Sequence, residues 1–378
     1  MDAGSAQPEL SIIIPVFNEA GNIQNLIQTL AAQRDIDFEL ILCDGGSSDG
    51  TPDRFREMAR RLSLPARTVV APRGRGRQMN AGAAAARGTF YLFLHADSDF
   101  VDGKALRTGL DALAAAMQSA GHDRVAGRFA LRFRQQTDTH RLFYYYHECK
   151  ARLNRAGCTH GDQGFLLHRH FFCLSGPFDE SIPVLEDTRL AETIRESGMW
   201  ILLPGEIHTS PRRFETEGCA RREILNTLVM AISASGRDDF LREMPRIYSS
   251  QDHTRGLSLY PFFLRIREML DALPFRERVS FWYACGSCAV ANIWQIAFFI
   301  DALRHFRLGL PPGEGENSLL RHFSRYGAAL VDHPAGRTVA AVMAWACLRL
   351  ICTLGRFREG PGRGGLPPAD FHKGVDDV

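Results

Sequence analysis

The sequence lacks several features that would assign it to a common class of protein. Its 45 Lys and Arg residues nearly balance 43 Asp and Glu residues, and a net charge of +2 at pH 7 gives no reason to expect a nucleic-acid partner. At the N-terminus no charged segment precedes an apolar run, so no signal peptide pattern is visible. The nine cysteines are scattered and odd in number. We therefore expect reduced thiols and a cytoplasmic location.

Two common nucleotide-binding fingerprints are also missing. Gly74-Arg75-Gly76 begins a glycine-rich pattern, but Met79 stands where the third glycine of the dinucleotide fingerprint would be. No Gly-Lys-Ser or Gly-Lys-Thr sequence marks a phosphate-binding P-loop. A nucleotide would therefore have to bind this chain through residues other than these glycine-rich motifs.

The chain alternates apolar runs with amphipathic segments. Apolar runs predict strands, and 3.6-residue periodicity predicts helices. The expected strands are 11–16, 38–42, 67–71, 90–94, 125–133 and 200–203, and the expected helices include 20–32, 77–86, 104–119 and 188–196. This alternation predicts an α/β fold with a Rossmann-like, mostly parallel sheet and flanking helices. We expect this domain over residues 1–235, and a mainly helical region of unknown role over 236–378.

Acidic residues follow two of the predicted strands directly. Asp44 and Asp49 come after the run 38–42, and Asp97 and Asp99 come after the run 90–94. Open α/β sheets bind ligands at the carboxyl ends of their strands. Carboxylates gathered there need a cation, and a divalent metal that carries a phosphorylated ligand meets this need. The pattern points to an enzyme that uses a nucleotide sugar.

Four segments carry a family resemblance by their order and spacing. They are Ser11–Glu19 with the Asp44 motif, Asn80-Ala81-Gly82, Leu174–Glu180, and Glu186-Asp187. Together they resemble glycosyltransferase family 2, which has the GT-A fold. More narrowly, Arg75–Gly82, His95-Ala96-Asp97 and Gly161–Gly164 are similar to a bacterial subgroup of transferases associated with radical-SAM and seleno-domain gene clusters. The resemblance covers residues 10–230.

The resemblance implies an inverting, metal-dependent transfer of a sugar from a nucleotide sugar to an acceptor hydroxyl that the sequence does not identify. We expect the donor to be UDP-linked and the cofactor to be Mn²⁺ or Mg²⁺. The leaving nucleoside diphosphate needs its growing charge neutralised, and the acceptor hydroxyl needs a positioned base.

The resemblance also implies which residues contact the donor. The expected nucleotide-sugar contacts are Pro15, Asn18, Glu19, Asp44, Arg75, Arg77, Asn80 and Asp97. Asp44 occupies the place of the nucleoside-binding Asp, and Gly45 stands where a second Asp is common. Met79 occupies a position often held by Arg, so Arg75 and Arg77 are the expected phosphate partners.

The metal ligands and the catalytic residues follow from the same alignment of motifs. Asp97 is the expected principal metal ligand, and Asp99, His95 and His208 are possible further ones. The pair Glu186-Asp187 matches the catalytic pair of the family, with Asp187 as the base. We expect Asp162 and Gln163 to hold the acceptor.

Each of these residues also has a plain structural interpretation. Asp44 and Asp49 stand in sequences that favour turns. Asp187 stands where an Asp can cap a helix. His208 could be a hydrogen-bonded histidine without a ligand, and Asp162-Gln163 could form a hydrogen-bonded loop.

Two apolar runs stand out after residue 236. The run 281–300 is uncharged and long enough to span a bilayer, whereas 338–348 is shorter. Polar residues within the longer run favour buried or interfacial helices over spanning ones. Arginines at 276, 278, 304 and 307 would suit an anionic surface, so we expect peripheral contact with the inner face of the cell membrane. Residues 360–368 are expected to be a disordered tail.

Two other classes of function remain open on the sequence alone. A nucleotidyltransferase of related fold would need a glycine-rich basic loop after the first strand, and Pro15–Glu19 is not such a loop. A non-catalytic nucleotide-sugar-binding protein would lack the acid on the acceptor side, and Asp187 argues against that.

Overall fold

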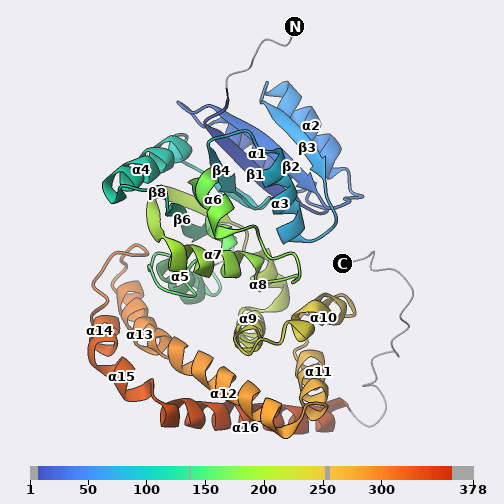
Figure 1. The fold of residues 1–378 in the computed structure, drawn as a ribbon, viewed down its shortest axis with the longest axis vertical. Helices are drawn as coiled ribbons and strands as arrows, with labels where there is room; N and C mark the ends of the chain where they lie inside the picture. Colours follow the sequence, from blue (N-terminus) through green and yellow to red (C-terminus); the bar gives the residue numbers. More distant parts are fainter. Residues whose placement is uncertain (1–6, 136–137, 252–255, 360–378) are drawn as a thin grey trace. The chain divides into compact units, whose positions relative to one another are not determined.

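The computed structural model describes residues 7–135, 138–251 and 256–359 (Figure 1). The chain divides into two compact units between Pro211 and Arg212. The division lies before α8 (Arg212–Glu217) and α9 (Cys219–Ala234), whereas the sequence predicted it after residue 235. The reason is packing, because α9 contacts α8 and the later helices of its own unit.

An eight-stranded mixed sheet forms the first unit. In spatial order its strands are β3 (Ala66–Val70), β2 (Phe38–Asp44), β1 (Leu10–Val16), β4 (Phe90–Phe93), β7 (Phe165–His168), β6 (Val125–Phe133), β8 (Met199–Thr209) and β5 (Ser98–Phe100). The first four are parallel, as are β6 and β8. β7 is antiparallel to β4 and β6, and β5 is antiparallel to β8. The α/β class is confirmed. Neighbouring strands are all parallel only in the half of the sheet formed by β3, β2, β1 and β4.

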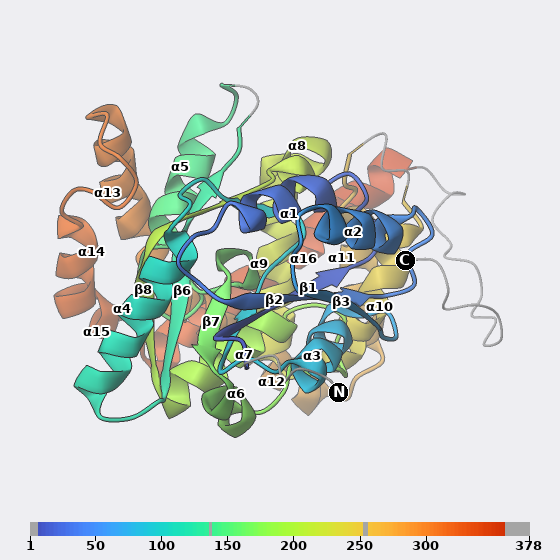
Figure 2. The same ribbon diagram turned by 90° about the horizontal axis from the view of Figure 1, so that it is seen from above.

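Helices cover both faces of this sheet (Figure 2). One face packs against α1 (Ile23–Ala31), α2 (Thr51–Arg61) and α4 (Ala105–Ala120) through strand residues such as Ile12 and Leu40. The other face packs against α3 (Arg75–Ala85), α6 (Arg169–Ser175) and α7 (Glu186–Ser197) through Ile13 and Ile41. Because both faces are buried, the central strands appear in the sequence as continuous apolar runs.

Most of the elements expected from periodicity are present within a few residues of their expected bounds. β5 and the full length of β8 are the exceptions, since only 200–203 was predicted as a strand. β5 has three residues, Ser98-Asp99-Phe100, which carry no strand pattern of their own. Pairing with β8 makes this segment a strand.

Glu39 ties the amino ends of three strands together. It is buried, and Oε1 accepts hydrogen bonds from Ser11 Oγ of β1 (2.8 Å) and from the backbone N–H of Arg87 (2.7 Å). Oε2 accepts from the guanidinium groups of Arg67, on β3, and Arg87. This end of the sheet lies opposite the carboxyl ends of β1 and β2, so we assign Glu39 to stability.

The described part of the second unit is helical, as expected. After α8 and α9 it contains α10 (Asp238–Ser249), α11 (Tyr260–Asp271), α12 (Phe275–Asn292), α13 (Trp294–Arg307), α14 (Ser318–His322), the π-helical turn η3 (Phe323–Gly327), α15 (Ala328–Val331) and α16 (Pro334–Glu359). α12 packs so closely on α16 that residue 286 has no room for a side chain. A Cβ on Gly286 would lie 2.2 Å from the Arg337 carbonyl oxygen. The tail expected at 360–368 lies outside the described residues.

Two stretches of this unit are long and apolar enough to cross a membrane. They are Phe275–Arg307 and Pro334–Thr353, each with a mean hydropathy of 1.4. Only 28% of the first apolar window and 17% of the second is buried, whereas a core helix of a soluble protein is mostly buried. Ile293 interrupts the first stretch between α12 and α13.

We expect Glu39→Gln to lower the free energy of unfolding by about 2–4 kcal/mol at neutral pH, because it leaves two guanidinium groups without their shared anion. Burial tends to raise the Glu39 pKa, but the hydrogen bonds from Arg67, Arg87 and Ser11 outweigh it, and the pKa is lowered from 4.5. The ionised Glu39 carboxylate therefore stabilises the fold fully above about pH 4.5. This stabilisation is lost as the pH falls through the lowered pKa.

Urea unfolding of both proteins at pH 7 and at about pH 3.5 measures this effect. The difference between them should shrink at the lower pH, because there the unfolded wild-type chain takes up a proton at this carboxyl and part of the stabilisation is lost. Asp53→Asn is the control, since the Asp53–Arg56 pair is exposed and should contribute under about 1 kcal/mol. A difference that is the same at both pH values would contradict the assignment.

Candidate active site

Loops from both halves of the first unit meet at the carboxyl ends of β1, β2 and β4. Because β7 is antiparallel to β4, the register pairs Phe93 at the end of β4 with Phe165 at the start of β7. The loop after β4 therefore lies beside the 3₁₀ turn η1 (Gly161–Gln163), which precedes β7. The first residues of α3 and α7 also lie together, since a Cβ on Gly76 would be 3.5 Å from Glu186 Cβ.

The loops after β1 and β2 are locked to each other by side-chain caps. Asn18 Oδ1 accepts a hydrogen bond from the backbone N–H of Ser48 (2.9 Å), and Asp49 Oδ2 accepts one from Ala20 (2.9 Å). The Glu19 backbone N–H donates to the hydroxyl of the first residue of α2 (2.9 Å). Asn18 has a φ of 54°, a left-handed conformation that Asn tolerates. The expected donor contacts Asn18 and Glu19 thus hold a double loop at the sheet edge.

Asp44 ends β2 and is buried. Its carboxylate accepts hydrogen bonds from the backbone N–H groups of Gly46 (3.2 Å) and Ser47 (3.1 Å). The turn therefore uses part of the hydrogen-bonding capacity of Asp44. A carboxylate can accept further hydrogen bonds, so Asp44 can also bind a ligand. Pro15, the neighbouring predicted donor contact, is buried within β1 opposite Cys43.

Gln78 is a residue that the sequence analysis missed. Its Nε2 donates to the carbonyl oxygens of Val16 (2.6 Å) and Cys43 (2.8 Å), and so joins the ends of β1 and β2. A Cβ on Gly45 would lie 3.0 Å from this nitrogen. Gln78 thus occupies the space beside Gly45, the position where the family often has a second Asp. The only signal for it in the sequence is its place within the Arg75–Gly82 motif.

Arg75 and Glu186 form an ion pair that joins α3 to α7. Glu186 is 1% exposed, and within the described chain its Oε2 has no hydrogen-bond partner. Burial raises the pKa of Glu186, although the charge of Arg75 opposes this. Burial works to lower the pKa of Arg75, but the charges of Glu186 and Asp187 outweigh it and the pKa is raised. The guanidinium therefore stays charged.

Asp187 is fixed by backbone donors on both sides. Its Oδ2 accepts from the N–H of Gly161 (2.8 Å) and its Oδ1 from the N–H of Thr188 (2.7 Å). A Cβ at residue 161 would lie 2.9 Å from Asp187 Oδ2 and 3.0 Å from His95 Nε2, so a larger residue there would displace these side chains. Burial tends to raise the Asp187 pKa, but Arg75, His160 and the Gly161 hydrogen bond outweigh it and lower the pKa to about 2.

Asp162 shows the opposite shift. Burial raises its pKa to about 6, with help from the negative charges of Asp187 and Asp97 and against the charge of His160. Its Oδ1 is buried and makes no hydrogen bond to the residues described. His160, which Thr188 Oγ1 and the Gly157 carbonyl orient at 3.2 Å each, was not predicted as a site residue.

Two of the predicted binding residues use their amide groups inside the protein. Gln163 is buried, and its side chain bonds to His160 N (3.0 Å) and to the Ala151 carbonyl (2.7 Å). Asn80 bonds to both backbone groups of Phe178 (2.9 Å each) and so fixes the turn before α7. Arg77 is exposed and lines a shallow hollow beside Asn80.

The structure does not assemble the expected metal ligands Asp97, Asp99 and His208 into one cluster. Asp99 Oδ2 accepts hydrogen bonds from Asn25 (2.8 Å) and Arg134 (2.5 Å), so a guanidinium already neutralises it. His208 pairs with Asp99 in the β5–β8 ladder. Asp97 is half-buried, and in the described part of the chain no hydrogen bond engages its carboxylate. Asp97 is thus the carboxylate best placed to take a cation.

Comparison with known proteins shows what this domain is similar to. Residues 11–173 match the model of glycosyl transferase family 2. This range includes β1 to β4, the double loop, Arg75, Asp97 and Asp162. Glu186 and Asp187 follow a few residues beyond it.

Similar proteins with curated names match over shorter stretches. A PGL/p-HBAD biosynthesis glycosyltransferase of Mycobacterium bovis is 38% identical over 104 residues, which are 27% of this chain and 40% of that protein. The glycosyltransferase AglE of Haloferax volcanii is 41% identical over 61 residues, 16% of this chain and 19% of that protein. The chain thus spans less than half the length of these relatives.

Among solved structures, the mannosyltransferase PcManGT from Pyrobaculum calidifontis superposes over 93% of this chain and 89% of its own. The TM-score is 0.43 and the identity 16%. The match to the model of glycosyl transferase family 2 spans the strands and loops that build most of the site, and in this range the chain is similar to that family.

Proposed function

We propose that the first unit is an inverting glycosyltransferase that moves a sugar from a UDP-linked nucleotide sugar to an acceptor hydroxyl. The observation that carries this proposal is the convergence of Asp162, Glu186 and Asp187 around Arg75, with Asp97 near Asp162, at the ligand-binding edge of the sheet. These side chains come from the loop after β4, from η1 and from α7. A thermal-shift screen of nucleotide sugars, with and without Mn²⁺, tests the proposal because bound ligand stabilises the folded state.

The donor side is formed by the double loop and the start of α3. The carboxylate of Asp44, held by its own turn, faces the edge where the nucleoside would bind. Arg77 is exposed at the first turn of α3, and a helix N-terminus favours phosphate. Arg75 already serves the carboxylates, so Arg77 is the freer phosphate partner.

The residues at the site fit a divalent cation. Three carboxylates lie near one guanidinium and Asp97 lies near one of the three, Asp162. Glu186 and Asp162 have buried oxygens without partners within the described chain. Asp97 would hold the cation, which would neutralise the charge of the departing diphosphate. We propose Asp99 only as a secondary candidate, because Arg134 and Asn25 already bond to its Oδ2.

Asp187 would act as the base. The acceptor oxygen forms its bond to the anomeric carbon as the bond from that carbon to the phosphate oxygen breaks. The acceptor proton goes to the Asp187 carboxylate, and the electron pair leaves with the nucleoside diphosphate. With a pKa of about 2 Asp187 is ionised at neutral pH, as a base must be. Asp162, with a pKa of about 6, would hold the acceptor hydroxyl.

The helical second unit is the part of the protein that we expect to contact a membrane. We propose that this unit rests on an anionic membrane surface through α12, α13 and α16. Their large exposed apolar residues are Phe275, Val279, Tyr283, Ile296, Phe299, Ile300, Val339, Val342, Met343, Trp345, Leu350 and Ile351. Arginines 276, 278, 304 and 307 flank the first two helices, and apolar burial with basic flanks is the pattern of a surface-bound helix.

Asp97→Asn should abolish the dependence of nucleotide binding on divalent cations, because it removes the carboxylate that we expect to bind the cation. Calorimetric titration of UDP with Mn²⁺, and again with chelator, measures this. Asp99→Asn is the matched control and should keep the metal dependence while lowering stability. If Asp97→Asn binds UDP with unchanged, Mn²⁺-dependent affinity, the cation lies elsewhere.

Asp187→Asn should lower turnover by about a hundredfold or more while the affinity for the nucleotide sugar stays near wild type, as expected for a lost base. Asp162→Asn carries the same charge change in the same site and should chiefly raise the KM for the acceptor. Melting temperatures of both variants control for misfolding. Full turnover in Asp187→Asn, with loss in Asp162→Asn, would move the base to Asp162.

Replacing both Val342 and Met343 by Asp should reduce binding to anionic vesicles by about tenfold or more, because it places charge on the apolar face. Val70→Asp is the matched control, since Val70 is an exposed apolar residue of the first unit. High salt should release wild-type protein from membranes. Extraction only by detergent would indicate a spanning segment, and absence of vesicle binding would exclude the membrane.

A further inference from the structure

A second cluster of metal-ligating side chains lies at the opposite end of the sheet. Asp123 stands in the turn between α4 and β6, His168 ends β7, and His170 lies in the first turn of α6. The register pairs His168 with Phe90, the first residue of β4, whereas Asp97 follows the last residues of β4. The cluster is therefore separate from the proposed active site.

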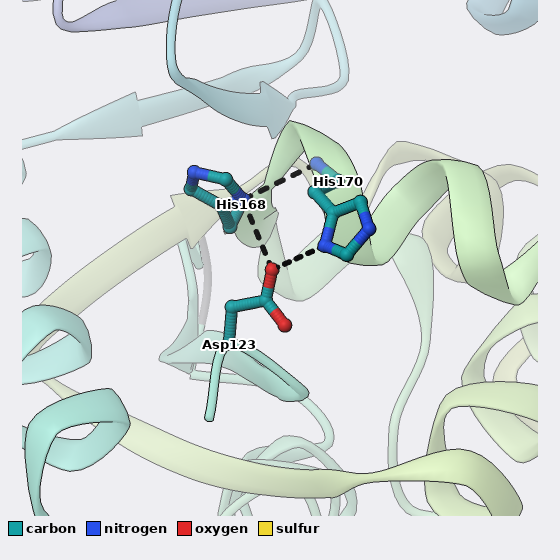
Figure 3. Close-up of side chains that lie close together, drawn as sticks. All are labelled: Asp123, His168 and His170. Atoms are coloured by element: carbon teal, nitrogen blue, oxygen red, sulfur yellow. Dashed lines mark hydrogen bonds and ion pairs between the residues drawn. The ribbon is translucent and has the colours of Figure 1, made fainter. Parts of the chain in front are cut away.

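Both imidazole rings turn toward one carboxylate oxygen (Figure 3). Asp123 Oδ2 lies 2.5 Å from His170 Nδ1 and 3.5 Å from His168 Nδ1, and all three ligand atoms lie within 4.8 Å of one another. Among the described residues this is the one group of three or more such side chains. Two atoms bound to the same Zn²⁺ lie about 3–3.5 Å apart, since each is about 2.0–2.2 Å from the ion. A small outward turn of His170, which is 60% exposed, would admit the ion.

Packing holds the His168 ring in a fixed orientation before any metal binds. The His168 ring meets the Phe90 ring edge-on, with centroids 5.3 Å apart. His168 Nδ1 accepts the backbone N–H of His170 (3.2 Å), so it already points out of the sheet toward the cluster. A cation would replace this weak bond, and its remaining positions would open to solvent, because His170 is exposed.

We propose that Asp123, His168 and His170 bind a divalent cation of the zinc class, which ties the start of β6 to the end of β7. Two imidazoles and one carboxylate suit Zn²⁺, Ni²⁺ or Co²⁺, whereas Mg²⁺ and Ca²⁺ prefer sites made of oxygen. The ligand types therefore predict a different kind of ion here from the Mn²⁺ or Mg²⁺ expected at Asp97.

The test is a calorimetric titration of the full, chelator-treated chain with ZnCl₂, carried out in the Asp97→Asn background to remove the other cation site. We expect one Zn²⁺ per chain, with a raised melting temperature and no comparable binding of MgCl₂. Asp123→Asn and His170→Gln should each weaken Zn²⁺ binding by at least about tenfold, since even indirect changes around a metal ligand have effects of this size.

His122→Asn is the matched control, because His122 is an exposed histidine in the same turn and lies outside the cluster. It should leave the Zn²⁺ affinity unchanged. Melting temperatures of the metal-free variants near that of the parent show that the fold is intact. Equal Zn²⁺ affinity in all the variants, or no binding by the parent, would overturn the proposal.

Discussion

The ion pair between Arg75 and Glu186 is the constraint on which the site depends. It joins the start of α3 to the start of α7, two helices on the same face of the sheet that are far apart in the sequence. A buried carboxylate is costly unless it is paired, so Glu186 holds the guanidinium in place. Asp187 and Asp162 then share the field of the same cation, and their pKa values shift in opposite directions.

The remaining architecture serves to hold these charges at fixed positions. Gln78 and Asn80, both on α3, bond to backbone groups of the strand ends and of the turn before α7. Gly161 leaves room for Asp187 and His95 to approach η1. Preorganised groups of this kind need little rearrangement when charge develops on a substrate. The amide groups of Gln78 and Asn80 are for this reason largely unavailable to bind ligand.

One strand direction explains why the first unit carries two separate clusters. β7 runs against β4, so the residues before β7 join the acidic loop after β4, while the residues after β7 lie at the far end of the sheet. The first group meets Asp97 and Asp187, and the second meets Asp123. The same short strand thus places Asp162 in the proposed active site and His168 in the proposed zinc site.

The sequence by itself determined most of the strands and helices and the acidic residues at the strand ends, because burial on both faces and local turn chemistry leave a direct pattern. The motifs also pointed to Asp97, Glu186 and Asp187. Only the tertiary structure decided how those residues are used. Asp99 is taken by Arg134, Asn80 and Gln163 bond within the protein, and Gln78 and His160 enter the site. These outcomes depend on contacts between distant segments and on the direction of β7, and no local pattern in the sequence encodes either.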